Sequence, residues 1–472
     1  MANKLYCLLF FSLISSSLGA QTFAHERSSE YVPPKEPEVI RQLDRWQDLK
    51  FGMLIHWGLY SRLGIVESWS ICSEEEEWIP RDSAASYDAY KRSYWATIDS
   101  FKPDKFDPAA WATAGRQAGM GYVVFTTKHH DGFNMFDTKQ SDFSIAKGAF
   151  RDDPRRNVAK EVFAAFRQES YMVGAYFSKP DWHSQYYWWD RYATPNRNNN
   201  YSIDKNPWRW NKFKEFTYSQ IEELLNGDYG AIDILWLDGG WVRPAGGAAR
   251  AGRAYKGSQD IDMPRIAAMA RRYQPGILMV DRTVPGEFEN YQTPERGIPD
   301  SRPDAPWESC IPLGNDWGYV PTDVYKTPTK VIHTLAEITA KGGNLLLGIG
   351  PKPDGTLPGE VVARLRQVGA WLQKNGKAIF NTRPAPIYHS GDTWFTQSKD
   401  GKKTYAIACW EEGQPAPRSV TWQGNEPAPG GKIVCLQTGK PAAWKKTGGG
   451  VEVTLPSPKD LPVGVAALAF EF

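Results

Sequence analysis

Short apolar runs alternate with amphipathic runs from about residue 44 to residue 381. The apolar runs are rich in β-branched, leucine and aromatic residues, whereas the amphipathic runs repeat apolar residues every three or four positions. The apolar runs predict strands at 51–56, 122–128, 172–179, 232–238, 277–282 and 344–350. The amphipathic runs predict helices at 108–118, 158–169, 208–226, 263–273 and 328–341. Strands that alternate with helices form a parallel sheet with right-handed crossovers.

Two of the predicted helices begin with the same pair of signals. Asp107 and Thr327 are residue types that cap helix N-termini, and each precedes a proline, Pro108 or Pro328. Proline suits the first helical position because the N–H of that position has no partner inside the helix. We therefore expect helices to begin at these two prolines.

Polar or ionisable residues follow nearly every predicted strand. They are His56, Lys128, His129, His130, Asp131, Lys179, Asp181, His183, Asp238, Asp281 and Arg282. A doubly wound open sheet gathers such residues mainly at one switch point, whereas a barrel collects them around its whole mouth. The pattern therefore predicts an α/β fold of the (β/α)8 TIM-like barrel type. Six strands are visible in the pattern, and the other two are inferred from the length of the chain.

The pattern changes after Pro384, where short alternating segments replace the helical period. These segments lie at 393–397, 404–410, 431–436, 450–455 and 465–472, between clusters of Gly, Pro and Asn. Alternation with frequent turn residues is typical of antiparallel strands. We expect residues 21–384 to form a catalytic barrel and residues 385–472 a C-terminal antiparallel β-sandwich domain.

Residues 1–20 have the features of a secretory signal peptide: Lys4, then an apolar stretch, then the small-residue exit Ser17-Leu18-Gly19-Ala20. We expect export to the periplasm or secretion. We expect no membrane insertion, because no later run approaches the roughly 18 apolar residues of a membrane span. The 56 basic and 54 acidic residues nearly balance, so the sequence gives no electrostatic footprint for nucleic acid.

The four cysteines after the signal peptide are Cys72, Cys310, Cys409 and Cys435. Their spacing is not that of metal ligands, and an exported chain tolerates disulfides. Cys409 and Cys435 lie on neighbouring predicted strands, so a disulfide between them and free buried thiols are both open.

The run Ile232-Asp233-Ile234-Leu235-Trp236-Leu237-Asp238-Gly239-Gly240-Trp241 ends a predicted strand with a carboxylate, two glycines and an indole. Catalytic residues of a barrel gather at this end of the strands, so Asp238 is a candidate. The indoles of Trp236 and Trp241 suit the apolar C–H faces of a sugar ring. An aspartate that caps a turn after a core strand is the alternative interpretation.

Hydrolysis of a glycosidic bond needs a second carboxyl group from another loop of the same mouth. Glu287, Glu289 and Glu295 follow the predicted strand at 277–282, and Glu308 comes later. Position alone does not choose among them, and surface acids on a loop are the simpler explanation for most of them.

The histidines allow two hypotheses. His129, His130 and Asp131, completed by His56 and His183, could hold a metal as in barrel metallohydrolases. Adjacent residues of a strand point to opposite faces, and the chain lacks a His-x-His pair, so neutral donors to sugar hydroxyls are the favoured interpretation. We therefore expect no metal and no cofactor.

Over residues 45–385 the sequence resembles the α-L-fucosidases of glycoside hydrolase family 29, and the β tail is placed as in that family. The resemblance rests on Phe51-Gly52-Met53-Leu54-Ile55-His56-Trp57-Gly58, Glu77-Trp78-Ile79-Pro80-Arg81, Thr127-Lys128-His129-His130-Asp131-Gly132-Phe133, Leu235-Trp236-Leu237-Asp238-Gly239, Tyr291-Gln292-Thr293-Pro294-Glu295, Trp307-Glu308-Ser309-Cys310 and Asn344-Leu345-Leu346-Leu347-Gly348-Ile349-Gly350-Pro351. The His-Trp-Gly and His-His-Asp-Gly-Phe motifs in this order are highly specific.

The resemblance implies roles for individual residues. Asp238 matches the nucleophile, and Glu295 is our choice for the acid/base, with Glu289 second. Residues that match positions around the fucose are His56, Glu77, Trp78, His129, His130, Tyr176, Trp236 and Arg282. The segment Glu67-Ser68-Trp69 offers a second Glu-x-Trp and competes with the assignment of Glu77.

The implied activity is that of a retaining exo-α-L-fucosidase, which removes terminal α-L-fucose from a fucosylated oligosaccharide or glycoconjugate through a covalent fucosyl-enzyme. Three alternatives remain open: another retaining glycosidase, a metal-dependent barrel hydrolase that uses His129, His130 and Asp131, and a sugar-binding protein without catalysis.

Overall fold

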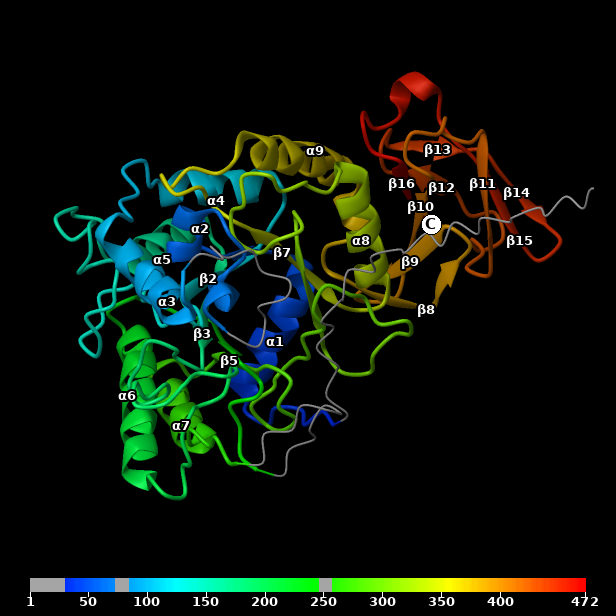
Figure 1. Cartoon of the computed structure of the whole chain (residues 1–472). Coiled ribbons are helices and arrows are strands. Elements are labelled where there is room, and N and C mark those ends of the chain that lie inside the picture. The colour runs from blue at the N-terminus through cyan, green and yellow to red at the C-terminus, as the bar shows by residue number, and fades with distance from the viewer. Residues whose placement is uncertain (1–29, 73–84, 246–256) are drawn as a thin grey trace, which may run out of the picture.

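The computed structural model describes residues 30–72, 85–245 and 257–472, which form a large lobe and a smaller C-terminal lobe (Figure 1). A parallel sheet of seven strands, in the order β5-β4-β3-β2-β1-β7-β6, is the centre of the large lobe. Its strands are β1 Phe51–Ile55, β2 Tyr122–Lys128, β3 Met172–Ser178, β4 Ile234–Asp238, β5 Leu278–Asp281, β6 Glu308–Pro312 and β7 Asn344–Ile349. The predicted signal peptide, residues 1–20, lies outside the described residues.

Helices surround this sheet (Figure 1). They are α1 Pro37–Leu49, α2 Leu59–Leu63, α3 Tyr87–Ala96, α4 Pro108–Gln117, α5 Val158–Gln168, α6 Pro207–Leu225, α7 Met263–Tyr273, α8 Pro328–Ala340 and α9 Gly359–Asn375. The six predicted strands and five predicted helices are present, with ends shifted by two residues at most. Both expected N-caps are confirmed, since Asp107 accepts a bond from the Ala110 N–H and Thr327 from the Lys330 N–H.

An irregular segment takes the place of the eighth strand. Residues 289–296 run between β5 and β6, the two edges of the seven-stranded sheet. Asn290 donates its N–H to the Met279 carbonyl on β5 at 2.8 Å, and Glu308 on β6 donates its N–H to the Gln292 carbonyl at 2.8 Å. This segment, which we call the closing segment, therefore joins the edges and completes the barrel.

The barrel interior is filled by side chains from every strand. The cluster inside it comprises Leu54, Tyr122, Val124, Met172, Tyr176, Ile234, Trp236, Leu278, Val280, Tyr291, Cys310 and Leu346, with Val39, Leu43 and Trp46 of α1. Helix α1 packs against the amino end of the strands. There the side-chain amide of Asn344, the first residue of β7, donates to the Trp46 carbonyl at 2.7 Å. The open end of the barrel is therefore the carboxyl end, where the site described below lies.

The C-terminal lobe is built from two antiparallel sheets, as the sequence predicted. One has the order β13-β12-β16-β10-β9-β8 and the other β11-β15-β14. The strands are β8 Thr382–Ser390, β9 Thr393–Ser398, β10 Thr404–Cys409, β11 Ser419–Gln423, β12 Ile433–Cys435, β13 Lys440–Ala442, β14 Trp444–Thr447, β15 Gly450–Thr454 and β16 Ala467–Glu471. Phe395, Trp422 and Phe470 lie in the core shared by the two sheets. Strand β8 runs across the predicted domain boundary at 384/385.

The six-stranded sheet of this lobe packs on α8 and α9. Trp371 of α9 donates its indole N–H to the Ala467 carbonyl at 2.9 Å, and His333 of α8 donates Nε2–H to the Ala466 carbonyl at 2.8 Å. The apolar core of the barrel continues into Tyr405, Ile407 and Ala469 of this sheet. The two lobes therefore share one buried interface.

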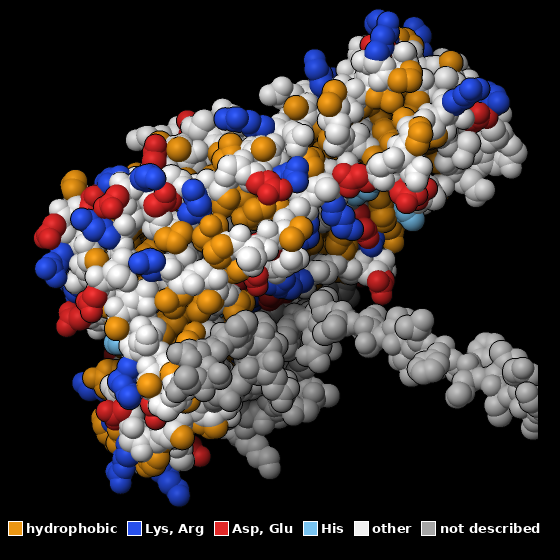
Figure 2. Space-filling view, turned by 45° about the horizontal axis from the view of Figure 1, so that its top comes forward, with side chains coloured by type: hydrophobic (Ala, Val, Ile, Leu, Met, Phe, Trp, Pro, Cys, Tyr) orange, Lys and Arg blue, Asp and Glu red, His pale blue; other side chains and the backbone are white. Residues whose placement is uncertain are grey.

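Surface charges of both signs are interspersed over the face drawn in Figure 2, in keeping with the formal charge of +2.

The structure shows Cys72, Cys310, Cys409 and Cys435 as buried free thiols, so Cys409 and Cys435 do not form the disulfide that their strands allowed. Across the described residues, no helix combines the length and the apolar character that a membrane crossing requires.

Candidate active site

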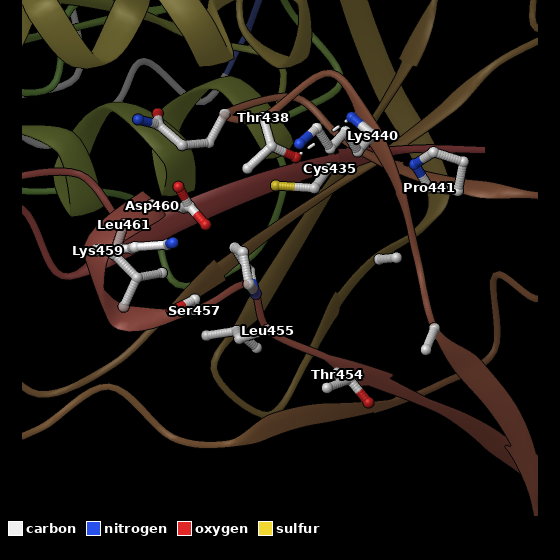
Figure 3. A pocket seen from close by; sticks show the side chains of 14 residues that line it. Cys435, Thr438, Lys440, Pro441, Thr454, Leu455, Ser457, Lys459, Asp460 and Leu461 are labelled. Atoms are coloured by element: carbon white, nitrogen blue, oxygen red, sulfur yellow. Dashed lines mark hydrogen bonds between the residues drawn. The ribbon is translucent and has the colours of Figure 1, made fainter.

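A cavity opens at the carboxyl end of the barrel. The empty space in it and in the open solvent at its mouth is about 410 Å³, and it is lined by Leu54, His56, Glu67, Trp69, His129, His130, Tyr176, Trp236, Asp238, Trp241, Arg282, Glu295, Cys310 and Trp317. A larger cavity of about 1090 Å³ lies in the C-terminal lobe, where Lys440, Lys459 and Asp460 are among its lining residues (Figure 3). That cavity has one carboxylate, Asp460, in its lining, whereas the barrel cavity has three, so the barrel cavity has the groups that acid/base chemistry needs.

Asp238 is the last residue of β4, and three donors hold its carboxylate. Oδ1 accepts from Arg282 Nη1 at 2.7 Å and from the Gly239 N–H at 2.8 Å. Oδ2 accepts from the Tyr176 phenol at 2.7 Å. Gly239 turns the chain here with φ +89°, and a Cβ at this position would lie 2.3 Å from Pro180 Cδ, so the turn requires glycine. Hydrogen bonds to the charged form stabilise an ionised Asp238.

Arg282 joins Asp238 to the second carboxyl group of the site. Its Nη2 lies 3.0 Å from Glu295 Oε2, and its Nε donates to Thr293 Oγ1 at 3.2 Å. The guanidinium carbon lies 4.3 Å from the centre of the Trp236 ring, and Nη2 lies 3.7 Å from Cys310 Sγ. The Arg282 side chain is 3% exposed, so this guanidinium is a fixed bridge between Asp238 and Glu295.

The other candidate acids have different surroundings. Glu289 is buried, accepts from the Thr283 N–H at 3.1 Å and is not among the residues that line the cavity. Glu308 lies inside the barrel, where it accepts from the Tyr122 phenol at 2.8 Å and from the Trp236 indole at 3.1 Å. Burial raises the pKa of Glu308 to about 7. Of the four glutamates that the sequence offered, Glu295 is the one that lines the cavity with Asp238.

His130 presents an acceptor to the cavity. Ser178 donates its hydroxyl to the Pro180 carbonyl at 2.8 Å, so at 2.6 Å its oxygen must accept a proton from Nδ1 of His130. The lone pair of His130 is therefore on Nε2, which lies 3.7 Å from Asp238 Oδ2. Burial lowers the pKa of His130 well below its ordinary value, which keeps the ring neutral.

His129 presents the opposite group. The Ser68 oxygen accepts from the Asp131 N–H at 3.2 Å, and its hydroxyl contacts Nδ1 of His129. Ser68 is fully buried, so its hydroxyl proton needs an acceptor, and Nδ1 supplies it. The His129 proton is then on Nε2. Burial lowers the pKa of His129 to about 4. The two neutral rings, with centres 4.3 Å apart, together offer one donor and one acceptor to a sugar hydroxyl.

Aromatic rings form the floor and walls of the cavity. Tyr176 stacks on Trp236 with ring centres 5.3 Å apart, and His129 also stacks on Tyr176, with ring centres 5.7 Å apart. His56 packs on Trp317 at 5.2 Å, and burial lowers the His56 pKa well below its ordinary value. The cavity therefore combines apolar ring faces with many polar groups, which suits a sugar ring that has both C–H faces and hydroxyl groups.

Eight of the ten predicted site residues line this cavity together: His56, His129, His130, Tyr176, Trp236, Asp238, Arg282 and Glu295. The other two, Glu77 and Trp78, lie outside the described residues. Glu67 and Trp69, the competing Glu-x-Trp pair, line the cavity. Glu67 accepts from the N–H groups of Trp317 at 2.7 Å and Gly318 at 3.2 Å, and burial raises its pKa to about 7.

Trp317 was missed in the sequence. It follows β6 at the strand end where other cavity residues were found, but β6 itself was not recognised because it begins with the polar residues Glu308 and Ser309. A search for aromatic residues after the motif Trp307-Glu308-Ser309-Cys310, which the sequence did show, would have found it.

The metal set suggested by the sequence does not converge. Asp131 points away from the cavity and accepts from the Tyr94 phenol at 2.6 Å, while His183 stacks on Phe143 at 4.0 Å. A different set has ligand atoms within 4.8 Å of one another: His129, His130 and Asp238. Arg282 bonds to this same Asp238, and its positive charge opposes a cation there.

Comparisons with known proteins show the family of the chain. Residues 18–377 match the sequence model of the family described as Alpha-L-fucosidase. The human plasma alpha-L-fucosidase is 27% identical over 409 residues, which is 80% of this chain and 79% of that one. The structure of alpha-L-fucosidase isoenzyme 1 from Paenibacillus thiaminolyticus has a TM-score of 0.73 and 28% identity and covers 92% of this chain and 99% of that one.

A second solved structure, the alpha-fucosidase of Thermotoga maritima in complex with fucose, has a TM-score of 0.70 and 26% identity and covers 93% of this chain and 99% of that one. The family match spans most of the chain. The chain belongs to the α-L-fucosidase family of glycoside hydrolases.

Proposed function

We propose that the protein hydrolyses terminal α-L-fucosides with retention of anomeric configuration, with Asp238 as the nucleophile and Glu295 as the acid/base. The observation that carries this proposal is the bridge formed by Arg282, which bonds to Asp238 at 2.7 Å and to Glu295 at 3.0 Å. Retaining glycosidases need two carboxyl groups close together, about 5–5.5 Å apart, and one guanidinium shared by both keeps the pair at short range.

The reaction has two displacements. In the first, Oδ2 or Oδ1 of ionised Asp238 attacks the anomeric carbon, while protonated Glu295 gives its proton to the departing glycosidic oxygen. In the second, Glu295 takes a proton from water, and the resulting hydroxide displaces Asp238 from the sugar. The donors on Asp238 from Arg282, Tyr176 and the Gly239 N–H favour its charged form before attack and its release afterwards.

Fucose suits the cavity chemically. The donor on His129 and the acceptor on His130 can bind ring hydroxyls, and the Trp69, Trp236, Trp241 and Trp317 indoles offer apolar surface to ring C–H groups and to the C6 methyl group. The substrate would be a fucosylated oligosaccharide or glycoconjugate.

The test is a panel of p-nitrophenyl glycosides with and without chelator, followed by ¹H NMR of the first product. We expect turnover of the α-L-fucoside that chelator does not change, and release of α-L-fucose before mutarotation. Release of β-L-fucose would contradict the retaining mechanism, and turnover of a different glycoside in place of the fucoside would contradict the substrate assignment.

One observation supports a second candidate function, a metal-dependent hydrolase: the group of His129, His130 and Asp238. In that case chelator would abolish turnover, and elemental analysis of the active protein would find a bound metal.

Export is also part of this proposal. Mass spectrometry of the mature protein should find its N-terminus just after Gly19 or Ala20.

A further inference from the structure

We propose that Arg296 forms part of the leaving-group subsite and selects aglycones that carry an anionic group, a carboxylate or a sulfate, near the scissile bond. This inference rests on the proposed function, because it takes Glu295 to be the acid/base.

The location follows from the chemistry of Glu295. The departing oxygen receives its proton from this carboxyl group, so the leaving group must lie against it. Arg296 Nε lies 4.0 Å from Glu295 Oε1, whereas Arg282 holds Oε2 and reaches back to Asp238. Side-chain exposure rises from 3% at Arg282 to 13% at Glu295 and 30% at Arg296. Arg296 is therefore on the solvent side of Glu295, where an aglycone departs.

The Arg296 side chain is held in place. Its backbone has a left-handed φ of 56°, and its N–H donates to the Cys310 carbonyl on β6 at 2.9 Å. Nη1 donates to the Asn315 carbonyl at 2.7 Å, and the guanidinium carbon lies 5.1 Å from the Trp317 ring centre. A left-handed arginine beside a catalytic group is a costly conformation, which is often found at functional sites. The fixed guanidinium loses little further freedom when it binds an anion.

The charge of Arg296 is not fully balanced by its neighbours. Among the described residues, Glu295 is the one carboxylate within 4.0 Å of it, and Glu295 is neutral while it acts as an acid. Glu67 and Asp316 also interact with Arg296, but burial raises the pKa of Glu67 to about 7 and raises that of Asp316, which disfavours the charged form of both acids. Asp323 lies close to Asp316, and Lys326 lies close to Arg296. The formal charges of Asp323 and Lys326 are opposite and offset each other. An anion on the leaving group would therefore meet a net positive group at Arg296.

The experiment compares aryl α-L-fucosides that differ in charge but little in shape. 3-Carboxyphenyl fucoside is paired with its 3-carbamoylphenyl isostere, and 3-sulfophenyl fucoside with its 3-sulfamoylphenyl isostere. We expect the wild-type protein to show a kcat/KM about three- to tenfold higher for at least one anionic member than for its neutral isostere. The ratio should fall towards one at high salt, because the Debye length shortens.

Three variants isolate the role of Arg296. Arg296→Gln should bring the anionic-to-neutral ratio to about one, whereas Arg296→Lys should keep most of it. Arg302→Gln, which removes an exposed arginine six positions further along the chain, should leave the ratio unchanged. Because each ratio is internal to one variant, a general loss of activity does not imitate the effect.

A wild-type ratio of one, or a ratio that survives Arg296→Gln, would overturn the inference. The absence of turnover on every α-L-fucoside would instead overturn the proposed function. A preference restricted to the sulfophenyl pair would assign sulfate as the anion, and one restricted to the carboxyphenyl pair would assign a carboxylate.

Discussion

Tyr176 donates a 2.7 Å hydrogen bond from its phenol to Oδ2 of Asp238, from the neighbouring strand of the barrel. Burial and the charge of Asp238 raise the pKa of Tyr176 well above its ordinary value, so the phenol keeps its proton and remains a donor. The bond stabilises the carboxylate both as the nucleophile and as the leaving group in the second step.

Removal of this donor should slow the reaction without loss of the fold. Tyr176→Phe keeps the stacking on Trp236, so we expect kcat/KM to fall by about 10- to 100-fold, the effect of one hydrogen bond to a charged group. The matched control is Tyr171→Phe, whose buried phenol donates to the Ala112 carbonyl at 3.0 Å away from the cavity. Steady-state kinetics of both variants decide the matter: equal losses in the two would show that Tyr176 acts through stability alone.

Loss of the nucleophile should abolish turnover. Asp238→Ala should lower kcat by roughly 10⁴-fold or more while circular dichroism still reports the native secondary structure. Near-normal turnover by a folded variant would exclude Asp238 as the nucleophile. A fluorinated fucosyl donor that forms a slow intermediate gives a direct readout, because mass spectrometry of digested wild-type protein should then locate the fucosyl group on the peptide with Asp238.

Azide distinguishes the two candidate acids. Glu295→Ala should lower kcat/KM by about 10²- to 10⁴-fold for substrates with poor leaving groups, and added azide should partly restore turnover and give a fucosyl azide. Glu289→Ala removes the acceptor of the Thr283 N–H, so it should reduce stability with no azide product. The fucosyl azide from Glu289→Ala instead, identified by NMR, would move the acid/base to that residue.

Glu67 should make the folded protein less stable as the pH rises. Its pKa is raised by burial from 4.5 to about 7, so between these values the unfolded chain releases a proton that the folded chain keeps. Stability from this group is thus present below pH 4.5 and lost as the pH approaches 7. Glu67→Gln removes this titration, so the free energy of unfolding of wild type minus variant should fall by up to about 3 kcal/mol from pH 4 to pH 8.

Urea unfolding at several pH values measures this difference. The control is Glu287→Gln, which replaces an exposed glutamate and should leave the free energy of unfolding close to that of the wild type. A flat difference for Glu67→Gln would mean that Glu67 ionises in the folded protein as it does in the unfolded chain.

The regular part of the barrel could be predicted from the sequence because its strands obey a simple rule. A strand buried on both faces is a short continuous apolar run, and β2, β3 and β4 have that pattern. The same rule missed β6, since Glu308 points into the barrel and bonds to Tyr122 and Trp236 there. Sequence patterns treat a buried carboxylate as a surface residue unless its donors, which come from distant strands, are known.

Residues of the candidate site that directly follow a strand could be predicted from the sequence. Residues that a loop brings to the site could not. Asp238 and His130 each stand at a strand end, so their convergence follows from the parallel sheet. Glu67 and Trp69 belong to a loop that includes the 3-10 helix at Ser68–Ile71, and the sequence alone did not show that this pair lines the cavity. Glu67 is placed by the N–H groups of Trp317 and Gly318, some 250 positions away.

The closing segment is one part of the barrel wall whose length can change while the seven strands keep their positions. A regular strand alternates its side chains between two faces, so the insertion of a single residue would turn every later side chain to the wrong face. The segment between β5 and β6 is held at backbone points that include Asn290, Gln292 and Pro294, but it forms no continuous strand. Insertions and deletions there can relocate a proton donor while Asp238 stays fixed in β4. Natural variants of this protein should therefore differ most in length between β5 and β6, and the chemistry of the leaving group could diversify there first.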